Sequence, residues 1–272
     1  MFRFSPLHAI DRLSQVIDFC WEQTKKNGYA GYPVAVWEKD QLTDYVTRTF
    51  HHTTDQILVA GDRTIDAVVC LMVDETHNYL QTIGGVYSNQ LGTALAKLES
   101  YRDEFYPGYM LLIGYPNKTE VRQVMEQFGN LIEELNFYRL DEMTEDLPGV
   151  VSQLSREEFF RLAQIHDRLN PGVYWTAERI LDRWQIWQVY QLDGSAYSLV
   201  RQSQNTAEIY TLSFPDGFSR EIAGRLLSGT TYEVFRHGVD QLISSCEPGG
   251  ALDQIHRELG YQATGDYILF SI

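Results

Sequence analysis

The stretch that decides the fold closes the chain: LDQIHRELGY over Leu252–Tyr261, followed by GDYILFSI over 265–272. Its apolar spacing predicts a helix over Leu252–Leu259. The aromatic and aliphatic residues after it predict a strand over Tyr267–Phe270. A helix that leads into a closing strand is the end of a longer alternation, which can be followed backward along the chain.

A similar ending stands near the middle of the chain, where LIEELNFYRLDE occupies 131–142. We expect a helix over Val121–Leu135, opened by a capping box of Asn117 and Glu120, and then a strand over Phe137–Leu140. Two endings of one kind indicate two halves.

Each half reads as helix, helix, three-stranded meander, helix, strand, helix, strand. Matching turn residues keep nearly constant spacing, since Gly61 and Gly194 lie 133 positions apart and Gly108 and Gly238 lie 130 apart. This spacing supports an internal repeat. Shared element order can also arise without a repeat in an α/β protein, and the sequence leaves that alternative open.

An acidic stretch with Pro and Gly interrupts the pattern between the halves. Few contacts cross such a segment, so we predict a linker at 144–149 between an N-terminal domain, 1–143, and a C-terminal domain, 150–272. Ser155 and Glu158 form a second predicted capping box. The expected fold class is α/β of the mixed α+β kind, with two tandem domains that each have a central mixed β-sheet flanked by helices.

Composition is that of an ordinary globular protein, with 272 residues of which 44% are hydrophobic and 22% charged. The cysteines Cys20, Cys70 and Cys246 follow no disulfide or zinc spacing, and no metal is expected. A formal net charge of −15 makes nucleic acid an unexpected partner. The same charge would attract a cationic amine, although acidity that only maintains solubility is equally open.

No basic and apolar leader begins the sequence, and its apolar runs are too short to span a membrane. We therefore expect a cytoplasmic protein without a membrane partner. A homodimer is compatible with the sequence, which does not decide the oligomeric state.

The order of elements and the two endings resemble the GNAT superfamily of acyl-CoA-dependent N-acetyltransferases over nearly the whole chain. The family's closing pattern is Ala-x-x-x-Tyr-x-x-x-Gly-Phe, to which LDQIHRELGY is similar. The resemblance implies that acetyl-CoA, as acyl donor, lies where the fourth and fifth strands part. It also implies a pyrophosphate loop, Gln/Arg-x-x-Gly-x-Gly/Ala, that opens a helix, where free amides and glycine admit an anion.

The first stretch that resembles this loop is NQLGTA, over 89–94. It keeps Gly92 and Ala94 but has Asn89 in place of Gln or Arg, and its connection from the preceding strand is short. A helix-start glycine without a ligand is the alternative for Gly92.

The second such stretch is REIAGR, over 220–225, which keeps Arg220. Ala223 and Arg225 stand at the glycine positions, where a large side chain would crowd a phosphate. The resemblance implies the following cofactor-binding residues: Asn89, Gly92, Thr93, Ala94, Arg220 and Ala223.

The candidate catalytic residues lie in the second half. AEIYTLSF, over 207–214, resembles the family's fourth strand, with Glu208 near the position of the base that takes the amine proton. His256 falls on the position of the family's tyrosine acid, whereas the corresponding first-half residue, Ile132, cannot donate a proton. A solvent-facing Glu208 and a boundary His256 are the alternatives.

The resemblance implies an N-acetyltransferase that moves an acyl group from acetyl-CoA to an amine of a small molecule or peptide. The acceptor, the acyl group and the active half are not decided by the sequence. The better loop and the candidate base and acid stand in different halves. The alternative is therefore a catalytically degenerate GNAT-fold module that serves binding or interaction.

Overall fold

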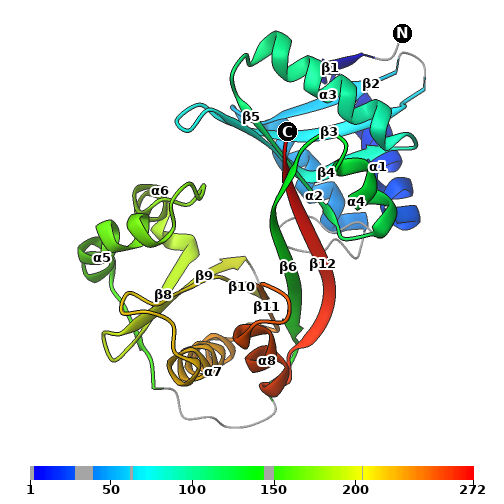
Figure 1. The fold of residues 1–272 in the computed structure, drawn as a ribbon. Coiled ribbons are helices and arrows are strands. Elements are labelled where there is room, and N and C mark those ends of the chain that lie inside the picture. Colours follow the sequence, from blue (N-terminus) through cyan, green and yellow to red (C-terminus); the bar gives the residue numbers. More distant parts are fainter. Residues whose placement is uncertain (1–2, 28–38, 62–63, 144–149, 204) are drawn as a thin grey trace. The chain divides into compact units, whose positions relative to one another are not determined.

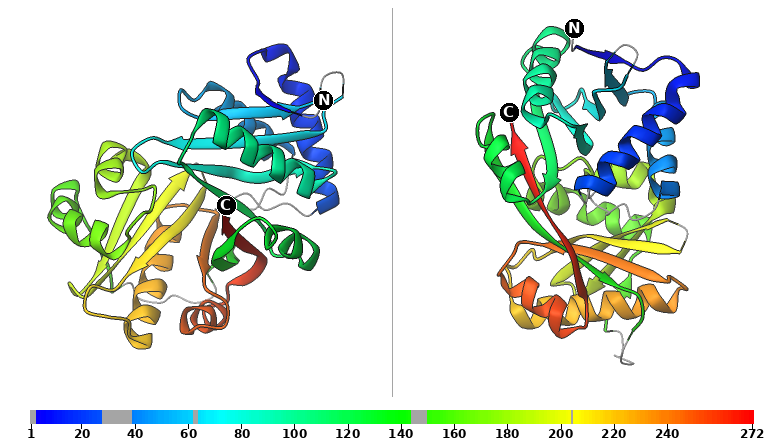
Figure 2. Two further views of the ribbon diagram at one scale, coloured as in Figure 1. Left: turned by 45° about the horizontal axis from the view of Figure 1, so that its top comes forward. Right: turned by 90° about the vertical axis from the view of Figure 1, so that its right-hand side faces the viewer.

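A computed structural model describes residues 3–27, 39–61, 64–143, 150–203 and 205–272 (Figure 1). Contacts divide the chain into two compact units. Unit 1 is Met1–Glu134 together with Gly265–Ile272, and unit 2 is Leu135–Thr264. Each unit is a β-sheet with helices packed on it (Figure 2).

Unit 1 buries both faces of its sheet. Val69 and Leu71 of one strand pack with α3 and α4, while the alternate residues Val68 and Cys70 pack with α1 and α2. Burial on both faces explains why this strand is a continuous apolar run. The elements of the first half of the sequence, in chain order, are β1 (Phe4–Pro6), a 3-10 helix (Ile10–Arg12), α1 (Leu13–Asn27), α2 (Lys39–His51), β2 (Gln56–Ala60), β3 (Ala67–Asp74), β4 (Tyr79–Ser88), α3 (Leu91–Phe105), β5 (Met110–Pro116), α4 (Thr119–Met125) and β6 (Asn130–Leu140).

Unit 2 has the same arrangement. Ala207 and Ile209 belong to the core with α7 and α8, whereas Trp187 and Tyr197 belong to the core with α5 and α6. The elements of the second half of the sequence, in chain order, are β7 (Ser152–Gln153), α5 (Arg156–Leu169), α6 (Ala177–Asp182), a 3-10 helix (Trp184–Ile186), β8 (Trp187–Leu192), β9 (Ala196–Ser203), β10 (Thr206–Ser213), α7 (Arg220–Arg236), β11 (Gln241–Cys246), α8 (Ala251–Glu258) and β12 (Gln262–Ser271).

The closing strands of the two halves are exchanged. β12, from the end of the chain, pairs antiparallel with β5 of unit 1, with Tyr267 opposite Pro116. β6, from the end of the first half, pairs antiparallel with β11 of unit 2, with Leu140 opposite Leu242. The strand orders are β1-β2-β3-β4-β5-β12 and β6-β11-β10-β9-β8-β7. Each sheet is therefore completed by a strand from the other half of the sequence.

This exchange bears on the expected domain boundaries. The compact units divide between Glu134 and Leu135, and residues 265–272 belong to unit 1 rather than to the half that precedes them. The linker predicted at 144–149 lies outside the described residues.

The structure corrects the expected end of the first half. The predicted helix over Val121–Leu135 ends at Met125, and the residues from Asn130 onward form β6, so this part of the prediction is wrong. The predicted capping box is also absent, because the N-cap of α4 is Lys118 without a side-chain cap, and the amide of Asn117 donates to Glu134 instead.

The capping box at the second half is confirmed. Ser155 Oγ accepts from the backbone N–H of Glu158, and the Glu158 carboxylate accepts from the backbone N–H of Ser155 at 2.7 Å. Helix α5 begins there.

Candidate functional site

Two parallel strands of unit 2 pair only at their beginnings. β10 and β11 are in register from Thr206 opposite Gln241 to Ile209 opposite Ser244. Both strands continue beyond this last pair, and a register shift against β9 between Ile209 and Thr211 marks a bulge in β10. We call this point the β10–β11 fork. A strand edge without a partner strand presents backbone groups that an extended ligand containing amides can pair with.

Glu208 lies on β10, one residue before the end of the paired register. Its side chain is buried, and its Oε2 accepts a hydrogen bond from Arg201 Nη2 of β9 at 2.7 Å. Burial raises the pKa of Glu208, and the neighbouring Arg201 charge opposes that rise. The solvent-facing alternative for Glu208 is therefore not what the structure has.

His256 of α8 contacts β11, the strand beside β10, and is fully buried. Its Nδ1 is 2.7 Å from the Leu252 carbonyl oxygen, and its Nε2 is 2.8 Å from Ser244 Oγ. A carbonyl only accepts, so Nδ1 carries the proton and the neutral ring accepts from the Ser244 hydroxyl at Nε2. Burial lowers the pKa of His256, which favours this neutral form.

Sequence reasoning missed the side chains that hold His256. Tyr138 of β6 stacks on the imidazole with ring centroids 4.8 Å apart, and its hydroxyl donates to Asp253. That hydrogen bond, together with those from Asn136 and the Gly249 N–H, lowers the pKa of Asp253 to about 2. Nothing in the local sequence signals this cluster, because Tyr138 and Asn136 enter unit 2 only through the exchanged strand β6.

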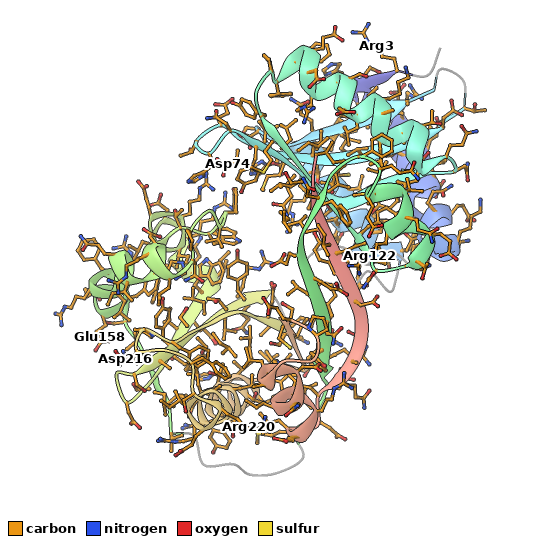
Figure 3. The ribbon with its side chains drawn as sticks, in the orientation of Figure 1. Arg3, Asp74, Arg122, Glu158, Asp216 and Arg220 are labelled. Atoms are coloured by element: carbon orange, nitrogen blue, oxygen red, sulfur yellow. The ribbon has the colours of Figure 1, made fainter. Side chains whose placement is uncertain are left out.

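The second-half loop residues lie at the start of α7. Arg220, labelled in Figure 3, is the first residue of the helix, and its guanidinium binds the Glu258 carboxylate at 2.6 Å. Ala223 is fully buried in the core, so its side chain faces away from solvent. Arg225, expected to crowd a phosphate, pairs with Asp193 at 2.8 Å. The space around Gly224 is open, since an added Cβ would meet no heavy atom within 4 Å.

The first-half loop residues lie at the start of α3, which begins at Leu91 and has no side-chain cap. Asn89 Oδ1 accepts from Gln23 Nε2 at 2.9 Å. A Cβ on Gly92 would approach a side chain of α4 at 3.7 Å, whereas Thr93 is exposed and Ala94 is buried. The structure thus brings the four predicted residues together at one helix start.

Unit 1 has a corresponding fork between β4 and β5, which are in register only from Tyr79 to Gln81 on β4. Beyond it, the protein's own groups join the two strands. Tyr115 of β5 donates its hydroxyl proton to the Val86 carbonyl at 3.2 Å. The Gly114 N–H donates to Thr82 Oγ1 at 3.1 Å. The β4–β5 fork is therefore bridged.

The two forks also differ in their titratable groups. Glu208 is the third residue of the paired register on β10, and Gln81 is the third on β4. A glutamine amide cannot take a proton at neutral pH. Ile132, the predicted first-half counterpart of His256, lies on strand β6 rather than on a helix and is 52% exposed.

Comparisons by sequence find no match, either among protein-family models or among curated proteins. Solved structures match along the whole chain. A GCN5-related N-acetyltransferase from Sphaerobacter thermophilus is 13% identical with a TM-score of 0.72, covering 100% of this chain and 95% of its own. A tandem GNAT protein from the clavulanic acid biosynthesis pathway is 12% identical with a TM-score of 0.64, covering 100% and 98%. The chain has the tandem GNAT fold. A putative acetyltransferase from Pyrococcus horikoshii, 11% identical with a TM-score of 0.64, covers 100% of this chain and 89% of its own.

The fork of unit 2 fits an extended, amide-containing ligand better than the fork of unit 1 does. The parallel pairing of β10 and β11 ends at Ile209 and Ser244, which leaves strand edges for such a ligand. At the start of α7, Ser219 Oγ accepts from the Ile222 N–H, and the space around Gly224 is open. In unit 1, Tyr115 and Thr82 occupy the equivalent edge.

Metal sites and membrane spans are two further features to consider in the tandem GNAT fold. Within the described ranges, no group of three or more His, Cys, Asp or Glu side chains is placed to hold a metal ion. None of the helices in the described part of the chain combines the length and apolarity that a membrane span requires.

Proposed function

We propose that unit 2 transfers an acetyl group from acetyl-CoA to the amine of a small molecule or peptide. The observation that carries this proposal is the β10–β11 fork, which opens one residue after the buried carboxylate of Glu208. A fork for an extended thioester and a base beside it are the two parts that acyl transfer to an amine requires.

The proposed chemistry is direct attack within a ternary complex. The acceptor nitrogen forms a bond to the thioester carbonyl carbon, the carbon–sulfur bond breaks, and the sulfur leaves as a thiolate. Glu208 takes the proton that the nitrogen loses. Its raised pKa makes it a stronger base than an exposed glutamate, and the Arg201 charge opposes the rise and favours the ionised form that can take a proton.

The role of His256 as the acid is subject to one condition. The Nδ1 proton is held by the Leu252 carbonyl, so a proton reaches the thiolate only from Nε2 through Ser244. In that relay a protonated His256 gives its Nε2 proton to Ser244 Oγ while Ser244 gives its own to sulfur. Because burial lowers the pKa of His256, the relay requires a form that is a minority at neutral pH.

Unit 1 has a different proposed role. Its bridged fork and the amide of Gln81 in place of a carboxylate favour a non-catalytic half. We infer that unit 1 supports unit 2 rather than carrying out the reaction itself.

Glu208→Gln tests the base. The substitution keeps shape but removes the basic site, and kcat is expected to fall by about 10²- to 10⁴-fold while acetyl-CoA binding is retained. The rate at which free CoA thiol is released from acetyl-CoA in the presence of a panel of amines measures kcat. Calorimetry measures the binding of acetyl-CoA. Glu157→Gln, at an exposed carboxylate of α5, is the matched control and should leave both unchanged. Unchanged turnover in Glu208→Gln would remove Glu208 from the mechanism.

A further inference from the structure

A chain of aromatic rings in unit 2 leads to the strand that carries Glu208. Trp175 lies edge-to-face with Trp187 at 5.2 Å between ring centroids, and Trp187 lies edge-to-face with Tyr210 at 5.6 Å. Trp175 comes from the segment before α6, Trp187 begins β8, and Tyr210 lies at the bulge of β10. We call these three side chains the aromatic row.

The aromatic row and Glu208 are neighbours on one face of the sheet. Trp187 is directly opposite Arg201 on β9, and Arg201 is directly opposite Glu208 on β10. Residues opposite one another across strands share a face. Tyr210 follows Glu208 by two positions and packs in the same core as Trp187.

The row contains a buried donor without a partner. Trp187 is 4% exposed, and its indole Nε1–H has no hydrogen-bond acceptor among the described residues. Buried donors are nearly always paired, so an unpaired one calls for an explanation such as a bound ligand. Trp175 and Tyr210 are only half-buried, which leaves part of each ring accessible to a ligand.

Charges near the row limit what an acceptor can carry. The Glu208 carboxylate is already paired with Arg201 at 2.7 Å. At the other end, the Arg183 guanidinium lies over the Trp175 ring at 5.9 Å from its centroid. These cations repel a second positive charge on the acceptor, while Glu208 accommodates one amine.

We propose that the acceptor is a monoamine attached to an aromatic or similarly flat apolar group, with the flat group on the aromatic row and the amine at Glu208. Aromatic surfaces bind flat rings by edge and face contacts and add attraction for an ammonium. A polyamine or a lysine-rich peptide fits the site less well, because each brings further positive charges. This inference rests on the proposed function for its catalytic step.

The test compares three amines and two tryptophan variants. We expect 2-phenylethylamine to have a KM at least about tenfold below those of n-butylamine and spermidine. Trp175→Leu should raise the KM for 2-phenylethylamine about tenfold with little change in kcat, and leave n-butylamine unaffected. Trp184→Leu is the matched control: Trp184 packs on Phe159 in the same core, 5.7 Å between centroids, but is not part of the row.

A binding measurement separates this inference from the proposed function. Titration with 2-phenylethylamine alone, followed by tryptophan fluorescence, reports on the row whether or not the protein turns over acetyl-CoA. Binding that Trp175→Leu weakens and Trp184→Leu preserves supports the inference. Spermidine or n-butylamine binding as tightly as 2-phenylethylamine, or a Trp175→Leu variant with native melting and unchanged affinity, would overturn it.

Discussion

At the scale of single residues, the proposed acyl transfer depends on the protonation of Glu208. Burial raises its pKa and the Arg201 guanidinium lowers it, and the balance is a net rise. A base must be ionised to take a proton, so activity is lost as pH falls through this raised pKa. The acidic limb of the rate profile should therefore lie at a higher pH than an exposed glutamate would produce.

Arg201→Met tests that balance. Removing the charge and its hydrogen bond takes away the influences that lower the pKa of Glu208, so the acidic limb of log(kcat/KM) against pH should move to higher pH. Rates from pH 5 to 9, with melting curves to confirm folding, measure the shift. A limb that stays in place or moves to lower pH contradicts the role of Glu208. The same profile for His256→Gln examines the acid, whose loss should remove the alkaline limb.

At the scale of elements, the local sequence pattern predicts whether a segment is a helix or a strand better than it predicts which strands pair. The helix and strand of the closing stretch, and the capping box at Ser155, are present as predicted. Residues 131–135 are predicted to continue a helix but form part of β6. Pairing with a strand that is distant in sequence decides the secondary structure of such a short apolar segment. The strand exchange has no local signature, since β6 and β12 would have the same pattern in either sheet.

The site shows the same limit. Glu208 could be placed on its strand from sequence, whereas its partner Arg201 and the stack of Tyr138 on His256 depend on strand register. The hydrogen bond by which Tyr115 bridges the β4–β5 fork likewise depends on tertiary structure and cannot be predicted from the local sequence.

Phe270→Ala tests the exchange. Phe270 of β12 is fully buried in the unit 1 core, so its truncation should destabilise the protein by about 3 to 5 kcal/mol. Hydrogen exchange should locate the loss of protection in β4 and β5 rather than in β10. Phe160→Ala, at a residue that is 68% exposed, is the control and should cost within about 0.5 kcal/mol. Loss of protection confined to unit 2 would show that β12 does not belong to the first sheet.

At the scale of the whole molecule, the proposed function requires different roles for two units of one fold. The carboxylate and the open fork occur together in unit 2, while unit 1 has a glutamine and a bridged fork at the same positions. The exchanged strands connect their stabilities, because each core includes residues from the other half of the sequence. The retention of unit 1 can thus be explained by structure without a second active site.

Titration of the purified protein with acetyl-CoA, repeated with Gly224→Trp and Thr93→Trp, tests this division most directly. Both substitutions lie near a helix start and point into open or exposed space, so both variants should fold. We expect one acetyl-CoA per chain, lost in Gly224→Trp and kept in Thr93→Trp. Binding lost only in Thr93→Trp, or no binding to the intact protein at millimolar ligand, would contradict the assignment of catalysis to unit 2.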